Sequence, residues 1–159
     1  MRDRYFVNKI KDTDAAYIAG FIDGEGSIGL RTAHSNDGKT PNYTLRMRIT
    51  NTNLEVLAWI QAIVRQGSIR KIKMYQFNKK QGYEIYWGGR VARNILVQIQ
   101  PYLKVKALQA KIGIEFAKTI KSRGGVLMDD SLRKERDIFR TQMDTANASN
   151  KGGLNGKLS

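Results

Sequence analysis

Two kinds of hydrophobic periodicity follow one another along the 159-residue chain and predict a mixture of helices and strands. Residues Tyr43–Asn51 form the clearest strand, because Leu45, Met47 and Ile49 alternate with polar or cationic residues. This strand therefore has one apolar and one cationic face. Over the whole chain the two periods predict helices at Asp14–Gly24, Leu54–Val64, Arg90–Ile99, Tyr102–Ser122 and Ser131–Thr145, and strands at Ser27–Thr32, Tyr43–Asn51, Ser68–Phe77 and Tyr83–Trp87.

The order of these elements predicts an α+β fold in which helices cover one face of an antiparallel four-stranded sheet. The opposite face would present basic and polar side chains, among them Arg46, Arg48 and Arg70. We expect a single domain over residues 1–145, with extra helices at its C-terminal end. The segment 146–159 is rich in Asn, Gly and Lys, a composition that predicts a flexible basic tail.

Charge indicates the kind of partner. The 28 Lys and Arg residues outnumber the 14 Asp and Glu residues, which gives a net charge of +14. Residues 28–106 hold 14 of these cations and three of the acids, so +11 of the +14 lies there. A positive charge of this size favours a polyanionic partner, usually nucleic acid.

The composition also excludes several classes of protein and of site. The absence of cysteine rules out disulfides and thiolate metal sites, and a single histidine rules out nuclease centres built on several histidines. No apolar run is long enough for a membrane span, and no signal peptide is visible. We therefore expect a soluble intracellular protein, in a prokaryotic cytoplasm or an organelle matrix, with no membrane partner and no small-molecule cofactor.

The most informative segment joins the first predicted helix to the first predicted strand. An apolar helix runs into two carboxylates, Asp23 and Glu25, which alternate with Gly24 and Gly26. A helix C-terminus carries partial negative charge, so acids at this end are unfavourable unless a cation compensates them. A divalent cation with oxygen ligands would do so. The spacing of Gly24, Gly26 and Gly29 also fits a dinucleotide-binding pattern, but that pattern follows a strand and opens a helix, the reverse of the order here.

Small residues mark one side of the same helix. Ala16, Gly20 and Gly24 are spaced four residues apart and form a strip with almost no side chain. Glycine within a helix costs about 0.5–1 kcal/mol relative to alanine, so two glycines on one side indicate close approach by another helix. Pairing two copies of the chain along this strip would bring both Glu25 side chains together. We therefore expect a homodimer whose interface includes Ala16, Gly20, Asp23 and Gly24.

Residues Ile18–Gly26, with the sequence Ile-Ala-Gly-Phe-Ile-Asp-Gly-Glu-Gly, resemble the signature motif of the LAGLIDADG homing endonucleases, with Glu in place of the commoner final Asp. The resemblance implies an α-β-β-α-β-β-α fold with a curved DNA-binding sheet. It implies a site-specific double-strand DNA endonuclease of the intron- or intein-homing kind. In that family Glu25 and the Gly24 carbonyl would bind catalytic Mg²⁺, with Mn²⁺ or Ca²⁺ able to occupy the same sites. Single-motif members are homodimers that cut a long pseudo-palindromic site across the minor groove and leave 3′ overhangs.

Two downstream positions are similar to functional positions of the same family. Asn51 stands where the family places a polar residue, often Gln, that positions water, although Asn is shorter. Lys106 ends the segment Gln100–Lys106, which resembles a family segment whose last lysine lies near the cleavage site. The resemblance thus makes Glu25, Asn51 and Lys106 the catalytic candidates. The expected DNA-contacting residues are Arg31, Arg46, Arg48, Thr50, Ser68, Arg70, Lys73, Lys79, Lys80, Glu84 and Tyr86.

Two other functions are compatible with this resemblance. The first is an RNA-binding intron maturase, which would bind structured RNA and tolerate loss of Glu25. The second is a non-catalytic DNA-binding regulator on the same scaffold, which would normally have lost the motif acids. This chain keeps both acids, so the endonuclease is the leading hypothesis.

Overall fold

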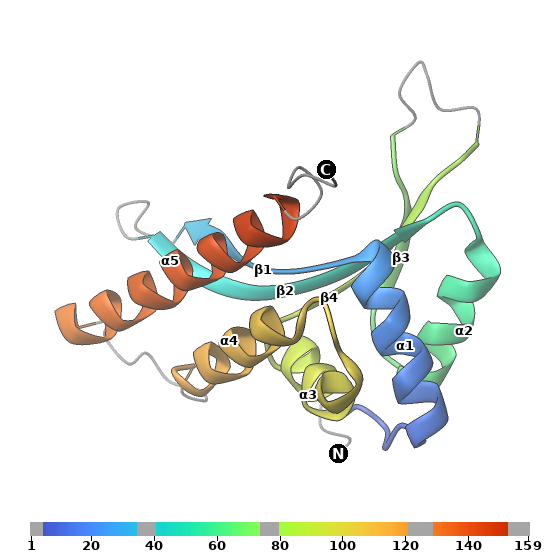
Figure 1. Cartoon of the computed structure of the whole chain (residues 1–159), viewed down its shortest axis with the longest axis horizontal. Coiled ribbons are helices and arrows are strands. Elements are labelled where there is room, and N and C mark those ends of the chain that lie inside the picture. The colour runs from blue at the N-terminus through green and yellow to red at the C-terminus, as the bar shows by residue number, and fades with distance from the viewer. Residues whose placement is uncertain (1–4, 35–40, 74–79, 121–128, 153–159) are drawn as a thin grey trace, which may run out of the picture.

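The computed structural model describes residues 5–34, 41–73, 80–120 and 129–152. Four strands and five α-helices are found in these ranges, together with one short 3₁₀ helix (Figure 1). In chain order they are α1 (Asp12–Glu25), β1 (Gly26–His34), β2 (Pro41–Asn51), α2 (Leu54–Val64), β3 (Ser68–Lys71), β4 (Tyr83–Gly88), α3 (Gly89–Ile99), η1 (Gln100–Tyr102), α4 (Ala107–Lys118) and α5 (Asp130–Gly152). The predicted α+β class and element order are confirmed.

All strand pairs of the sheet are antiparallel, in the order β1-β2-β4-β3. The helices α1, α3 and α4 lie on one side of it, as Figure 1 shows. The side chains that point to them are buried and apolar, including Met47, Ile49, Ile85 and Trp87. The alternation that predicted β2 therefore divides the sheet as expected into an apolar face on the helices and a polar face away from them.

Helix α1 passes into β1 without an intervening loop. Gly26 is the first residue of β1, and its N–H donates to the carbonyl of Ile22, which closes the last turn of the helix. A Cβ at Gly26 would lie 2.8 Å from both the Cα and the carbonyl oxygen of Ile22. Only glycine therefore allows the chain to leave the helix this abruptly, and Glu25 becomes the last helical residue.

The predicted helix Tyr102–Ser122 is wrong at its start. The 3₁₀ turn η1 ends at Tyr102, an irregular segment follows, and α4 begins only at Ala107. The backbone N–H groups of Lys104, Val105 and Lys106 all donate to the carboxylate of Asp23 rather than to preceding carbonyls. Hydrogen bonds to Asp23, which is distant in sequence, thus shift the start of α4 toward the C-terminus. At the other end α4 stops at Lys118, and residues 121–122 lie outside the described ranges.

Two other predicted boundaries differ from the structure by more than two residues. Strand β3 ends at Lys71, so Ile72 and Lys73 fall outside it, and residues 74–77 are not described. Helix α5 does not end at Thr145 but continues to Gly152. The prediction of a flexible tail from Ala146 is therefore wrong for residues 146–152, which are helical. Ala146 is buried, and its carbonyl accepts a hydrogen bond from Gln109. Tertiary packing overrides the weak helix propensity of the Asn-rich segment.

Helix α5 also covers the outer edge of β1. Arg140 Nη1 donates to the carbonyl of Leu30 at 2.8 Å, and Asn147 Nδ2 donates to the carbonyl of Ile28 at 3.2 Å. These backbone carbonyls belong to the edge strand of the sheet, so side chains of α5 replace the missing neighbouring strand. Within the ranges that the structure describes, no helix is long and apolar enough to cross a bilayer.

Candidate active centre and nucleic-acid interface

Glu25 stands exposed at the C-terminal end of α1. Among the described residues, no hydrogen bond or ion pair occupies its carboxylate. The carbonyl of Gly24 belongs to the last turn of the helix, where carbonyls lack intrahelical donors. A free carboxylate beside helix-terminal carbonyls provides oxygen donors at a negative dipole end, which suits a hard divalent cation.

One chain offers few ligands for such an ion. In the part of the chain that the structure describes, no group of three or more Asp, Glu or His side chains lies close enough to hold a metal. Both oxygens of the Asp23 carboxylate, two residues before Glu25, accept hydrogen bonds from the backbone N–H groups of residues 104–106, at 2.7–3.1 Å. Glu25 is therefore the one motif acid with free oxygens. Asp23 joins α1 to the start of α4, and its predicted place at a dimer interface stays a prediction.

Lys106 lies beside this junction. Its Nζ donates to the backbone carbonyl of Asp23, and its side chain is half-buried. Burial lowers the pKa of Lys106 from its ordinary value, while the nearby charge of Asp23 opposes that shift. The structure thus brings Lys106 to the end of the helix that carries Glu25, and its implied role near the cleavage site stays a prediction. The ammonium remains a hydrogen-bond donor held at a defined place.

A groove of about 490 Å³ extends from Lys106 along the polar face of the sheet. Strands β1 and β2 form its floor, and Asn147 and Asn150 of α5 form part of its wall. Arg31, Arg46 and Arg48 line it as well. Cations therefore surround a groove whose inner end lies next to the α1–β1 junction, an arrangement suited to a phosphate backbone.

Most of the residues predicted to contact DNA share this polar face. Strand pairing places Arg48 opposite both Ser27 and Tyr86, and Glu84 opposite both Thr50 and Arg70. The predicted residues that lie on this face are Arg31, Arg46, Arg48, Thr50, Ser68, Arg70, Glu84 and Tyr86. Lys73 and Lys80 are exposed outside the strands, and Lys79 lies outside the described residues.

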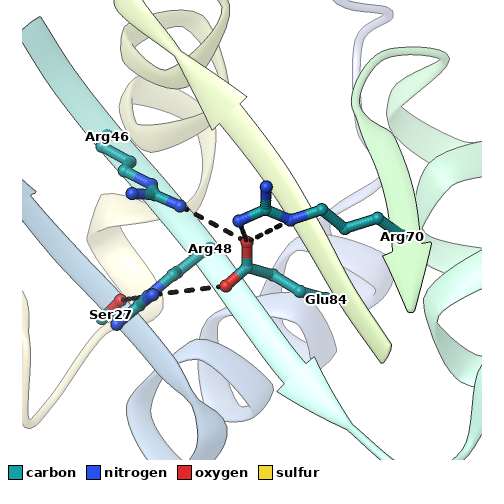
Figure 2. A network of polar contacts seen from close by, with 5 residues as sticks. All are labelled: Ser27, Arg46, Arg48, Arg70 and Glu84. Atoms are coloured by element: carbon teal, nitrogen blue, oxygen red, sulfur yellow. Dashed lines mark hydrogen bonds and ion pairs between the residues drawn. The ribbon is translucent and has the colours of Figure 1, made fainter. Parts of the chain in front are cut away.

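Glu84 organises the arginines of this face (Figure 2). Its side chain is only 4% exposed and forms ion pairs with Arg46 at 3.4 Å, Arg48 at 3.3 Å and Arg70 at 2.7 Å. Arg48 Nε also donates to Ser27 Oγ at 2.9 Å. One buried anion therefore fixes three guanidinium groups contributed by two strands. Their orientation is set before any ligand binds.

Asn51 has a local role in the structure. Its Oδ1 accepts a hydrogen bond from the backbone N–H of Asn53 at 2.8 Å. Asn53 in turn caps α2, because its Oδ1 accepts from the N–H of Val56. The Asn51 carbonyl oxygen is thus part of the turn between β2 and α2. Its implied role in positioning water stays a prediction.

The small-residue strip of α1 faces outward. Ala16, Gly20 and Gly24 are exposed, and a Cβ at either glycine would meet no heavy atom of the described chain within 4 Å. Nothing inside the described chain requires these glycines to be small. Next to the strip, Tyr17 is 52% exposed and packs edge-on against Trp59 of α2, with ring centroids 5.3 Å apart. An exposed aromatic pair beside a bare helix surface is typical of an interface with another protein.

Sequence reasoning missed several residues of this region. Ser27 could have been found, because alternation along β1 places it opposite the buried Ile28 and so on the polar face. Asn147 and Asn150 could not have been identified as site residues. Their position depends on the extension of α5 beyond Thr145, which the local composition does not favour.

The sequence model of the LAGLIDADG endonuclease family matches residues 18–122, about two thirds of the chain. The chain belongs to the LAGLIDADG endonuclease family. The predicted family is thereby confirmed, and the chain is an enzyme of the endonuclease class. The matched region includes the motif, the whole sheet and Lys106, whereas α5 lies beyond it.

Individual LAGLIDADG proteins agree with this assignment. The DNA endonuclease I-CvuI of Chlorella vulgaris is 27% identical over 129 residues, which cover 76% of this chain and 75% of I-CvuI. The crystal structure of I-CvuI with a DNA target and Mg²⁺ has a TM-score of 0.70 at 22% identity and covers 92% of this chain and 85% of that one. The archaeal intron-encoded I-Vdi141I, solved with DNA, has a TM-score of 0.68 at 21% identity, with 85% and 84% covered. The predicted fold is therefore confirmed.

One larger LAGLIDADG protein differs in length. I-GzeII, solved with its DNA target, has a TM-score of 0.66 at 14% identity. The comparison covers 91% of this chain but only 48% of I-GzeII. The fold of this chain thus corresponds to about half of that longer polypeptide.

Proposed function

We propose that this protein is a divalent-metal-dependent, site-specific endonuclease of double-stranded DNA. The observation that carries the proposal is the free carboxylate of Glu25, which directly precedes Gly26, a residue that lines the cation-rich groove. The I-CvuI and I-Vdi141I structures, both solved with DNA, support a duplex as the substrate. Mg²⁺ is the proposed cofactor, and Mn²⁺ and Ca²⁺ would occupy the same positions.

We propose further that the active enzyme is a homodimer. One chain contributes only Glu25 as a free motif acid, and the exposed strip of Ala16 and Gly20 lets a second α1 approach closely. Two chains paired in this way would place two Glu25 carboxylates and two Gly24 carbonyls at one centre. This fold covers about half of I-GzeII, so the length of that polypeptide would accommodate two such units.

The site residues of this chain would have separate roles in the hydrolysis of the phosphodiester bond. Bound metal ions would activate the attacking water and stabilise charge on the phosphate and the leaving oxygen. Glu25, with the Gly24 carbonyl, would hold them. Asp23 keeps the segment of residues 104–106 against α1, and Lys106 offers its ammonium to the scissile phosphate. Asn51 would orient water if its amide turned from its local hydrogen bond.

The sheet would bind the DNA on its polar face. A curved sheet face of this kind fits the major groove, where base edges carry the most sequence information. In a two-fold dimer the two sheets would read two related half-sites, so the target is expected to be long and pseudo-palindromic. By its resemblance to single-motif family members, the dimer would cut across the intervening minor groove and leave 3′ overhangs.

The test is to select cleaved sequences from a randomised duplex library in Mg²⁺ and then to compare Glu25→Gln with the wild type on the recovered site. The amide keeps the shape of the side chain and removes its charge, so cleavage should fall by several orders of magnitude while binding stays intact. Glu55→Gln, an exposed acid of α2, is the matched control and should cleave normally.

Two results would overturn this assignment. The first is Glu25→Gln protein that still cleaves at nearly the wild-type rate in Mg²⁺. The second is wild-type protein that cleaves no selected duplex but binds structured RNA tightly, which would favour the maturase function instead.

A further inference from the structure

The last turns of α5 contact segments next to two of the candidate catalytic side chains, Lys106 and Glu25. Asn150 Nδ2 donates to the carbonyl of Val105 at 3.2 Å, and Asn147 Nδ2 donates to the carbonyl of Ile28 at the same distance. Val105 immediately precedes Lys106, and β1, which contains Ile28, starts directly after Glu25. Because residues three apart lie on one side of a helix, a single side of α5 holds both segments.

Helix α5 is firmly placed where these contacts are made. Met143 and Ala146 are buried in the core. The buried side chain of Gln109 in α4 donates to the carbonyl of Ala146 at 3.0 Å. Nearer the start of the helix, Arg140 is bound to the carbonyl of Leu30. The asparagines therefore extend from a rigid support.

The segment of residues 104–106 is held from two opposite sides. Its N–H groups donate to Asp23 of α1, and the carbonyl of Val105 accepts from Asn150 of α5. Without the second contact, the backbone that carries Lys106 would be held only by Asp23 and by the hydrogen bond of the Lys106 carbonyl with Ala110 in α4. A long lysine side chain reaches a defined point only if its backbone is fixed, and an error of about 1 Å at a catalytic group can cost about 100-fold in rate.

We propose that Asn150 is a positioning residue for DNA cleavage and acts through Lys106, with Asn147 holding β1 in the same way. This inference rests on the proposed function, because it assumes that Lys106 serves the cleavage step. It assigns a function to α5, which lies outside the region matched by the family model. The C-terminal end of this helix is thus part of the active centre although it carries no reacting group.

The first experiment requires no DNA. Amide hydrogen exchange of residues 104–106 is measured in wild type, Asn150→Ala and Asn150→Asp. Asp is nearly isosteric with Asn but has no N–H donor, so both variants should speed exchange by about three- to tenfold, the range expected for removal of one hydrogen bond. Ser149→Ala is the matched control, because its hydroxyl bonds only within α5, to the carbonyl of Thr145. Unchanged exchange in both Asn150 variants would overturn the proposal.

The second experiment measures single-turnover cleavage and affinity on a duplex that the wild type has selected from a randomised library in Mg²⁺. Asn150→Ala, which introduces no charge, should lower the cleavage rate by about tenfold and leave affinity within about twofold. In a Lys106→Met background, Asn150→Ala should cause no additional loss, because both changes remove the same contribution. Ser149→Ala should cleave at the wild-type rate.

Failure of this inference can be distinguished from failure of the proposed function. Equal losses of rate and affinity, or rate losses that multiply in the double variant, would show that Asn150 does not act through Lys106. Failure of the wild type to cleave any selected duplex would instead reject the proposed function and the positioning role together. The exchange measurement would still decide whether Asn150 holds the segment.

Discussion

At the scale of single residues, Glu84 is the group whose removal should change the DNA-facing surface most. It is buried beneath three guanidinium groups that would otherwise repel one another. Glu84→Gln keeps the shape of the side chain but removes its charge and replaces one acceptor oxygen by an N–H donor group. Because Arg48 and Arg70 are well exposed and screened by solvent, we expect the free energy of unfolding to fall by only about 1–3 kcal/mol. Denaturant titration measures this change.

The same substitution should alter DNA selectivity. Three cations released from Glu84 would bind phosphates more readily, so affinity for an unrelated duplex should rise while the preference for the selected site falls several-fold. Competition binding at fixed salt measures the ratio. Glu55→Gln removes one negative charge from an exposed site on α2 and should leave the ratio unchanged. A Glu84→Gln protein with wild-type selectivity would mean that the ion pairs do not orient the arginines for base contacts.

A second prediction at this scale concerns pH. Burial lowers the pKa of Lys106, so its ammonium loses its proton at a lower pH than an ordinary exposed lysine. If the charged form assists cleavage, the rate should fall on the alkaline side before the ordinary lysine range, near about pH 10, is reached. Lys106→Arg stays protonated and should abolish this decline, whereas Lys104→Arg, at an exposed position, should retain it. Identical alkaline profiles for wild type and Lys106→Arg would contradict the assignment.

Lysine burial has the opposite consequence for stability. A lowered folded-state pKa means that the charged form is less favourable in the folded than in the unfolded chain. The resulting penalty is present at neutral pH and is relieved as pH rises through the folded-state pKa toward the unfolded-state value. Lys106 is therefore better explained by function than by stability.

Sequence patterns predicted most of the candidate site at this scale, and the reasons for success and failure differ by residue. Alternation placed Arg46 and Arg48 on the polar face, because strand geometry alone determines which side chains share a face. The cluster around Glu84 could not be predicted, because it depends on the register of three strands. The contacts of Asp23 with residues 104–106 join positions about 80 residues apart and have no local signature.

At the scale of secondary-structure elements, helix α1 carries the clearest prediction. Gly20→Val should dissociate the proposed dimer, because the branched side chain would hold the paired helices apart. Since a Cβ at Gly20 meets nothing within the described chain and valine has a better helix propensity than glycine, the monomer should lose no stability. Sedimentation analysis measures the oligomeric state.

Ala148→Val adds apolar bulk at an exposed position of α5 and provides the control for Gly20→Val. This variant should remain dimeric. A Gly20→Val protein that sediments as a dimer would show that the strip of Ala16, Gly20 and Gly24 is not the interface.

Elements whose stability is local were predicted well, and those stabilised by distant partners were not. Helix α2 matches its predicted position, and β2 starts only two residues earlier than predicted, because their apolar periodicity is regular and α2 has its own Asn53 cap. Helix α4 begins further along the sequence than predicted, because the N–H groups of residues 104–106 donate to Asp23. Helix α5 ends further along the sequence than predicted, because its Asn-rich last turns pack on the core and donate a hydrogen bond to β1.

At the scale of the whole molecule, the net charge of +14 should make DNA binding strongly dependent on salt. Removing one phosphate-binding cation should reduce the slope of log K against log salt by about 0.9. Arg31 lies on the polar face outside the Glu84 cluster and lines the groove, so Arg31→Ala should lower the slope with little change in site preference. Binding measured at several salt concentrations determines the slope. An unchanged slope would mean that Arg31 does not bind a phosphate.

Arg46 should behave differently from Arg31. Its guanidinium is paired with Glu84 and lies over the ring of Tyr86, 5.1 Å from the centroid, so its orientation is fixed. Arg46→Ala should therefore relax the preference at one base position of each half-site, at a cost of about 1–3 kcal/mol, rather than weaken all duplexes equally. Affinities for duplexes with single base changes measure this preference. Uniform weakening across sequences would identify Arg46 as a phosphate-binding residue.

The covering of β1 by α5 has a consequence for how the chain can be shortened. A chain ending before α5 would still contain every residue of the family motif and the whole sheet. It would also expose the carbonyls of Ile28 and Leu30 along the outer edge of the nine-residue strand β1, whose other edge pairs with β2. An exposed strand edge pairs with strands of other molecules, so the shortened protein would form aggregates through edge-to-edge pairing. Helix α5 is thus what keeps this DNA-binding sheet from growing beyond four strands.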